Sequence, residues 1–256
     1  MRATLRVLRR LLGVNLGLAM AYRGEFAFYV LGGLATPVVS LLIWRAALRS
    51  GARLPVDETY LTTYFVLMGV VQMLTSSWLA PYLAASIRRG ELSVWLVRPV
   101  PSPLDGIANN LVEKLLKLCW QAPAIALLWW LLDVRLPDAR WALVAVSVAL
   151  AAILVYAVDH LIGSLAFWFD DVGGLISANA LLARVLSGGV VPLALMPEWT
   201  SALPYRFMLS FPLEIAMGAP ALAAGLALQV AYTAIAVLGA RAVWRAGLRA
   251  YAAVGA

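Results

Sequence analysis

The sequence has few charged residues, one cysteine and one histidine. Only 13% of its 256 residues are Asp, Glu, Lys or Arg, whereas 63% are hydrophobic, and the mean hydropathy is +0.87. Soluble domains carry about 25% charged and about 45–50% apolar residues. A soluble chain of this composition would lack the polar groups to cover its surface. The composition therefore predicts a polytopic membrane protein that contacts the lipid bilayer.

The missing residue types and motifs exclude several kinds of site. Cys119 has no second cysteine with which to pair, so no disulfide framework exists within the chain. Neither the phosphate-cradling pattern GxxxxGKS/T nor the GxSxG turn of a serine nucleophile occurs. A single histidine also leaves no Cys/His cluster for a metal. We therefore expect this chain to have no catalytic residue, no metal and no cofactor of its own.

The first 24 residues have a basic start and an apolar middle, an order that also occurs in cleaved signal peptides. At 100° per residue, however, the four arginines among the first ten residues share one arc, and the aliphatic side chains occupy the opposite arc. Such a helix is suited to the membrane interface, and Asn15 interrupts what would be the apolar region of a signal. We expect an interfacial amphipathic helix over residues 1–24.

Six apolar stretches are long enough to cross a bilayer as a helix, which takes about 20 residues. The predicted crossings are residues 26–44, 60–82, 112–132, 141–167, 175–196 and 221–240. Residues 88–110 form a polar segment between the second and third crossings. Residues 197–220 contain several prolines but remain apolar, which favours short helices that re-enter the outer leaflet over a surface loop. The predicted fold is a single all-α integral membrane domain with six transmembrane helices.

The basic residues indicate the orientation of these crossings. Thirteen of the twenty Lys and Arg residues fall on the side of the two termini, six fall on the other side, and Arg184 lies inside a crossing. Basic residues accumulate on the cytoplasmic side of membrane proteins, so both termini are expected in the cytoplasm. These cationic flanks explain the net charge of +7, and we expect no nucleic-acid partner.

Asp159, His160 and Arg184 are ionisable residues inside predicted crossings that could take part in function. Asp159, beside His160, lies about 27 Å along its helix at ~1.5 Å per residue. That depth is near the cytoplasmic boundary of a core about 30 Å thick, so an interfacial pair is favoured over a proton relay. Arg184 lies roughly 18 Å deep and should face protein or water. A substrate path and a subunit interface fit it equally well. Its depth argues against pairing with Asp159, and Glu214 is a candidate partner if the segment 197–220 dips inward.

The stretch RRGELSVWLVRPV, residues 88–100, is unusual for a connector. Its arginines would hold any loop on the cytoplasmic side, but a simple connector does not need so many apolar side chains. A short helix that begins near Gly90, ends before Pro99 and has one apolar and one charged face is suited to docking into a groove on another protein.

Several segments, in order, resemble type 2 ABC transporter permeases of the bacterial, formerly uncharacterised branch. They are GELSVWLVRP at 90–99, LAFWFDDVGGL at 165–175, LSGGVVPLALMPEW at 186–199, FPLEIAMG at 211–218 and WRAGLRAYAAVGA at 244–256. The resemblance covers nearly the whole chain. It implies a permease subunit of an exporter in the bacterial cytoplasmic (inner) membrane. Its partners would be a second permease, identical or related, and two separate ATPase subunits that bind ATP and Mg.

The resemblance also implies two contacts with the ATPase. In that family a coupling helix between the second and third crossings touches the ATPase. Here the contact would comprise Arg88, Arg89, Gly90, Glu91, Leu92, Trp95, Arg98 and Pro99. Asp170 and Asp171, in the link DDVGG, would form a smaller second contact.

Two other functions are weighed against this one. An ion-driven secondary transporter calls for carboxylates near the midplane and discontinuous helices, and no Asp or Glu is predicted at mid-depth in any crossing. A membrane enzyme or scaffold subunit is the other alternative, and an enzyme would need paired acid/base or metal-binding residues at one depth.

Overall fold

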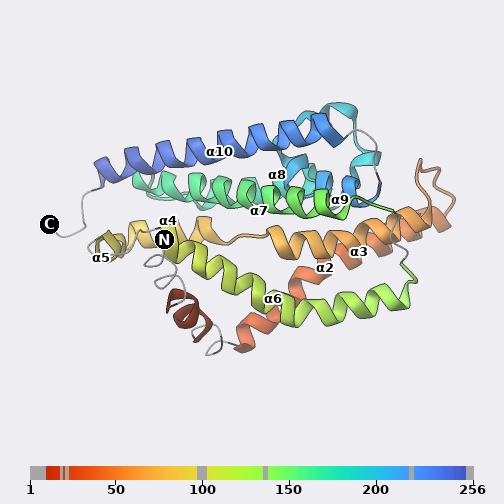
Figure 1. Ribbon diagram of the computed structural model, residues 1–256, viewed down its shortest axis with the longest axis horizontal. Coiled ribbons are helices and arrows are strands. Elements are labelled where there is room, and N and C mark those ends of the chain that lie inside the picture. Colours follow the sequence, from red (N-terminus) through yellow and green to blue (C-terminus); the bar gives the residue numbers. More distant parts are fainter. Residues whose placement is uncertain are drawn as a thin grey trace.

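The computed structural model describes residues 10–17, 20, 23–96, 103–134, 138–218 and 222–251, with the side chains of 23–31, 95, 103–105 and 222 excepted. Helices are the only regular elements in these residues. The long ones are α2 (Arg23–Arg49), α3 (Glu58–Thr75), α6 (Pro103–Leu131), α7 (Trp141–Ser164) and α10 (Leu222–Ala250). The shorter α-helices are α4 (Leu79–Arg88), α5 (Leu92–Leu96), α8 (Gly173–Leu186) and α9 (Ser210–Ala216). They form an elongated bundle (Figure 1).

Helix α7 is central to the bundle, where it packs against α10, α4, α3 and α9. It runs side by side with α10 (Figure 1). Two reciprocal hydrogen bonds join them: Ser147 Oγ donates to Gln229 Oε1 at 2.8 Å, and Gln229 Nε2 donates to the Ser147 carbonyl at 2.9 Å. Between apolar helices in lipid, such buried polar contacts hold a specific pair together.

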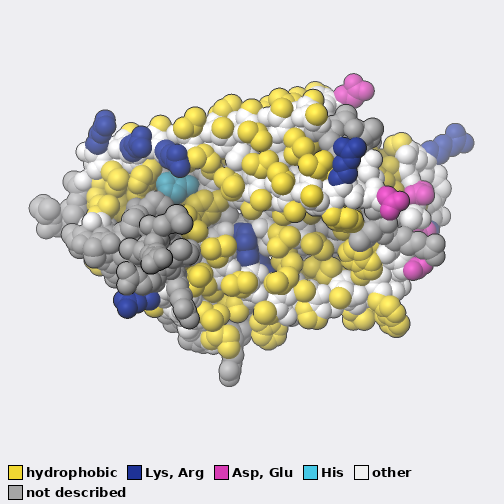
Figure 2. All heavy atoms as spheres, in the orientation of Figure 1, with side chains coloured by type: hydrophobic (Ala, Val, Ile, Leu, Met, Phe, Trp, Pro, Cys, Tyr) yellow, Lys and Arg dark blue, Asp and Glu magenta, His cyan; other side chains and the backbone are white. Residues whose placement is uncertain are grey.

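Three helical stretches are long and apolar enough to span a membrane: Glu58–Arg88, Trp141–Phe167 and Ala223–Ala250. They overlap the predicted crossings 60–82, 141–167 and 221–240. The face of the molecule shown in Figure 2 is also largely apolar, as lipid contact requires. The all-helical membrane class predicted from the composition is therefore confirmed, whereas the number of six crossings stays a prediction.

Two predicted crossings differ from the observed helices. The second is interrupted, because α3 ends at Thr75 and α4 begins at Leu79. The predicted crossing 175–196 contains α8, which ends at Leu186 after 14 residues. It ends there because the backbone turns at Gly188, whose φ of +89° suits glycine and where a Cβ would collide with the Ser210 side chain.

The segment 197–220 forms short helices, as its prolines and apolar residues predicted. They are the 3-10 turns η3 (Glu198–Ala202) and η4 (Pro204–Met208), followed by α9. Phe207 and Phe211 are fully buried in the main hydrophobic core, together with Tyr64 and Leu154. The part from Phe207 to Ala216 thus packs largely inside the protein, whereas Glu198 and Trp199 are exposed. The depth of the segment in the membrane stays a prediction. Of the predicted interfacial helix, residues 10–17 are helical and most of the rest lies outside the described residues.

Candidate functional site

The two segments predicted to contact an ATPase lie together in the structure. Arg88, in the last turn of α4, donates through Nη1 to the Asp170 carbonyl at 3.1 Å. The same nitrogen lies 3.9 Å from Asp171 Oδ1. Asp171 Oδ1 also accepts a hydrogen bond of 2.7 Å from the Gly173 amide, at the first turn of α8, where a carboxylate suits the helix dipole. Arg88 therefore joins the end of α4 to the start of α8.

Helix α5 presents only part of its apolar surface to solvent. Gly90 turns the chain between α4 and α5 with a φ of +74°, and Arg89 forms an ion pair of 2.8 Å with Glu91. Leu92 is 4% exposed and packs with the hydrophobic cluster at the end of α4. It therefore anchors α5 to the bundle, and its predicted contact with the ATPase stays a prediction.

Val94 and Leu96 remain outward on α5, 54% and 45% exposed. The Trp95 side chain, Arg98 and Pro99 lie outside the described residues. Among the described side chains of this short helix, Val94 and Leu96 supply the outward apolar surface, and neither was among the predicted contacts.

The residue that follows α10, Tyr251, contacts α5. The hydroxyls of Ser93 and Tyr251 lie 3.1 Å apart, and the Tyr251 ring packs edge-on against Phe167. Phe167 also contacts Trp244 of α10. We call this assembly the α5 end: the end of α4, α5, residues 165–172 and the last turns of α10. The contact between Tyr251, after α10, and Ser93 of α5 was not predicted from the sequence.

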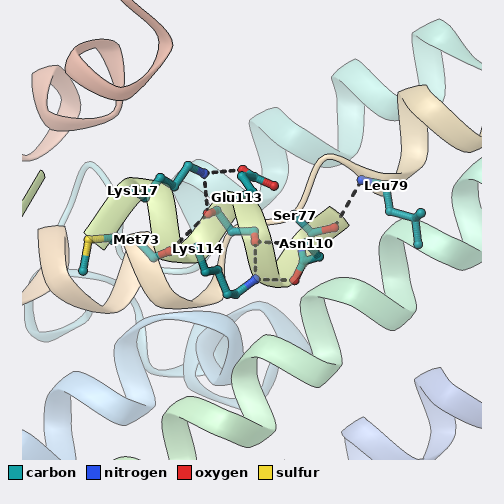
Figure 3. Close-up of polar contacts among 8 residues, drawn as sticks. Met73, Ser77, Leu79, Asn110, Glu113, Lys114 and Lys117 are labelled. Atoms are coloured by element: carbon teal, nitrogen blue, oxygen red, sulfur yellow. Dashed lines mark hydrogen bonds and ion pairs between the residues drawn. The ribbon is translucent and has the colours of Figure 1, made fainter. Parts of the chain in front are cut away.

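A buried charged cluster lies beside residues 76–78, the non-helical link between α3 and α4. We call this link the break. Asn110, Glu113, Lys114 and Lys117 of α6 point to this break (Figure 3). Lys114 Nζ donates to the Ser76 carbonyl at 2.9 Å, and Lys117 Nζ donates to the Ser76 hydroxyl at 2.8 Å. Lys117 also pairs with Glu113 at 2.5 Å, and both side chains are largely buried.

Asp159 of α7 lies on the other side of this break. Its carboxylate interacts with the Ser77 side chain and with the backbone amides of Leu79 and Ala80. The charges suit the helix dipoles: Lys114 lies at the C-terminal, negative end of α3, and Asp159 lies at the N-terminal, positive end of α4. The break is therefore a stabilised feature of the fold.

The sequence did not predict this cluster, because the two lysines were interpreted as cytoplasmic flanks and no Asp or Glu was expected at mid-depth in any crossing. Glu113 lies eleven residues inside α6. The available signal was the polar run Thr75–Ser77 within an apolar stretch, together with four polar side chains spaced three or four apart in α6.

A cavity of about 350 Å³ adjoins the break and reaches α8. Asp159 and Arg184 both line it, although their predicted depths differ. Arg184 is exposed and forms no ion pair among the residues that the structure describes. Its candidate partner Glu214 instead pairs with Arg206, whose Nη2 lies 2.5 Å from Glu214 Oε2. Sequence reasoning had overlooked Arg206.

A comparison with protein-family models shows which family this architecture represents. The model described as ABC-2 family transporter protein matches residues 56–255, which include the charged cluster and the α5 end. The chain belongs to the ABC-2 transporter family. The predicted resemblance is thereby confirmed. No curated protein and no solved structure matches the chain.

Family membership defines the broad role of this permease. ABC-2 proteins of this type are membrane subunits without an ATPase of their own, and they partner with ATPase subunits. The chain is accordingly a permease component of an ABC transporter.

Proposed function

We propose that this permease exports its substrate across the bacterial cytoplasmic membrane, with ATPase subunits docked at the α5 end. The observation that carries this proposal is the contact of Arg88 with Asp170 and Asp171. It unites two segments that are far apart in sequence and that both resemble ATPase-contacting segments. ATP and Mg would bind to the partner subunits, and both termini would lie in the cytoplasm.

The α5 end has the chemistry of a protein-docking surface. Val94 and Leu96 supply exposed apolar area, and the ion pair of Arg89 with Glu91 borders it. An apolar centre beside charged residues is the usual arrangement of protein interfaces. The apolar side chains would supply affinity, and the charges would set the register of the docked partner.

Helix α4 connects this surface to the charged break. It packs along α7, and the two backbones approach closely at Gly163, where an added Cβ would lie 2.9 Å from the Ala80 carbonyl oxygen. Because Arg88 joins α4 to the start of α8, displacement of the α5 end would move both elements together. The break at residues 76–78 would let α4 change its angle to α3. Alternating access needs two such packings of similar free energy, which nucleotide binding on the partner shifts.

Helix α8 supports the presence of a second permease. It has no buried residue in the isolated chain, and Leu181 is 64% exposed beside the exposed Arg184. An arginine exposed to hydrocarbon costs about 2.5–3.5 kcal/mol on insertion scales. A second permease, identical or related, would cover this face of α8. Arg184 would then lie at a substrate path between the two permeases.

An ion-driven secondary transporter is the second candidate, because the break between α3 and α4 is a discontinuous helix of the kind such transporters use. The carboxylates near the break, however, already interact with other groups of the protein. Glu113 pairs with Lys117, and Asp159 faces the first amides of α4. Neither is left to bind an ion, so the ATP-driven function fits the geometry better.

Site-specific photo-cross-linking tests the proposed docking surface. The permease is co-expressed with its ATPase partner subunit, and a benzophenone amino acid replaces Val94 or, as the control, Leu238, which is 63% exposed on α10. We expect cross-links to the ATPase from position 94 only. Equal cross-linking from both positions, or from neither, would contradict docking at the α5 end. Native mass spectrometry of the complex then counts two permeases and two ATPases if the assembly is as proposed.

A further inference from the structure

A second and larger cavity lies on the outer part of the bundle. It has a volume of about 970 Å³ and is lined by α3, α6, α7 and α10. Helix α3 packs against both α6 and α7, so the cavity is a groove that runs over α3 between these two helices. The same face carries extensive apolar surface, with basic side chains and the histidine within it (Figure 2).

One face of α7 forms the length of the groove. Lining residues recur every three or four positions from Trp141 to His160, and most of those between are alanine or valine. These small side chains leave room for a ligand. They also offer no hydrogen-bond partner, which disfavours a peptide backbone and favours a hydrocarbon chain.

The polar residues of the groove gather at one end. Lys114 of α6, His160 of α7 and Arg241 of α10 all line it there. Lys114 is engaged with the Ser76 carbonyl, whereas Arg241 is exposed and forms no ion pair among the described residues. His160 lies nineteen residues beyond Trp141, about 28 Å at ~1.5 Å per residue. Since the hydrocarbon core is about 30 Å thick, this end lies at a membrane boundary.

We propose that the groove binds one anionic phospholipid from the leaflet at the α5 end, with its phosphate at Arg241 and an acyl chain along α7. The charge is complementary, because Arg241 is a cation at headgroup depth that forms no ion pair with any residue the structure describes. The length also fits. From Tyr156 to Val144 the apolar part of the groove measures about 18 Å, close to the ~15 Å depth of one leaflet.

The site differs from the proposed substrate path. The smaller cavity at Arg184 adjoins α8, whereas this groove is lined by α6 and α10 and not by α8. Only the assignment of the leaflet as cytoplasmic rests on the proposed orientation. The proposal therefore stands or fails independently of where the ATPase docks.

Native mass spectrometry of the purified full-length permease tests this binding. Phosphatidylglycerol and phosphatidylcholine with the same acyl chains are titrated against the wild type and four variants. Arg241→Gln removes the headgroup contact, and Arg249→Gln removes an arginine of the same helix that does not line the groove. Ala149→Trp fills the apolar part, and Ala231→Trp places the same bulk on an exposed position of α10 outside it.

We expect one tightly bound phosphatidylglycerol and weaker phosphatidylcholine. Arg241→Gln should weaken phosphatidylglycerol about fivefold, the factor that corresponds to ~1 kcal/mol per cation near an anionic headgroup, and Ala149→Trp should abolish the tight site. The two control variants should bind as the wild type does. Equal affinity for both lipids, or wild-type binding by both groove variants, overturns the proposal. So does separation of two permease copies by Ala149→Trp without a change in lipid binding, because the groove would then be a subunit interface.

Discussion

Lys114 Nζ donates a hydrogen bond of 2.9 Å to the carbonyl oxygen of Ser76, one residue beyond the end of α3. The carbonyls at the end of a helix lack partners within it, and in a membrane they need another donor. Lys114 supplies that donor from a neighbouring helix. Lys114 of α6 therefore stabilises the break in the second crossing, and the break in turn gives this buried charge a hydrogen-bond acceptor.

The buried pair of Lys117 and Glu113 yields a stability prediction. Lys117→Met leaves the Glu113 carboxylate buried without its ion-pair partner, which typically costs 3–5 kcal/mol. We expect a clear fall in the thermal unfolding midpoint of the permease in detergent. The double variant Glu113→Gln/Lys117→Met should recover part of the loss because no charge then stays buried. A single variant as stable as the wild type would show that the pair is not buried in the membrane.

The close approach of α4 and α7 yields a second prediction. Gly163→Leu places a side chain where even a Cβ would lie 2.9 Å from the Ala80 carbonyl oxygen, and overpacking of this kind costs about 1–3 kcal/mol. We expect lower thermal stability and reduced transport. Gly174→Ala is the control, since an added Cβ there meets nothing within 4 Å. Stability unchanged in Gly163→Leu would mean that α4 and α7 do not pack closely.

The exposed face of α8 predicts the interface between two permeases. In a Cys119→Ser background, Leu181→Cys should form a disulfide between two copies under mild oxidation if the second permease is identical. Leu238→Cys, equally exposed but on α10, should stay monomeric on a non-reducing gel. Cross-linking of Leu238→Cys alone would place the interface on the opposite helix. If the second permease is a related chain, the same test applies with a cysteine on its corresponding helix.

The sequence predicted the features that depend on composition and local pattern. Apolar content and run length indicate a helical membrane protein, and the α5 segment is recognisable from its own thirteen residues. The partners of particular side chains could not be predicted. In the sequence Lys114 looks like an ordinary cytoplasmic flank, and only the structure places it beside the break between α3 and α4. Glu214 pairs with Arg206, eight residues away in the sequence, and not with Arg184. Such pairings depend on tertiary packing, which helical periodicity does not encode.

Arg88 joins the two segments that are proposed to couple the permease to the ATPase, so its removal is the decisive experiment. Arg88→Ala removes the contacts with Asp170 and Asp171, and because these groups are exposed, the loss of stability should stay below about 1 kcal/mol. The measurement is ATP hydrolysis by the co-purified ATPase in lipid nanodiscs, with Arg53→Ala, an exposed arginine of the opposite end, as the control. We expect Arg88→Ala to assemble with the ATPase but to lose most of the substrate-dependent stimulation, while Arg53→Ala retains it. Full stimulation in Arg88→Ala would show that the two segments do not act as one coupling surface.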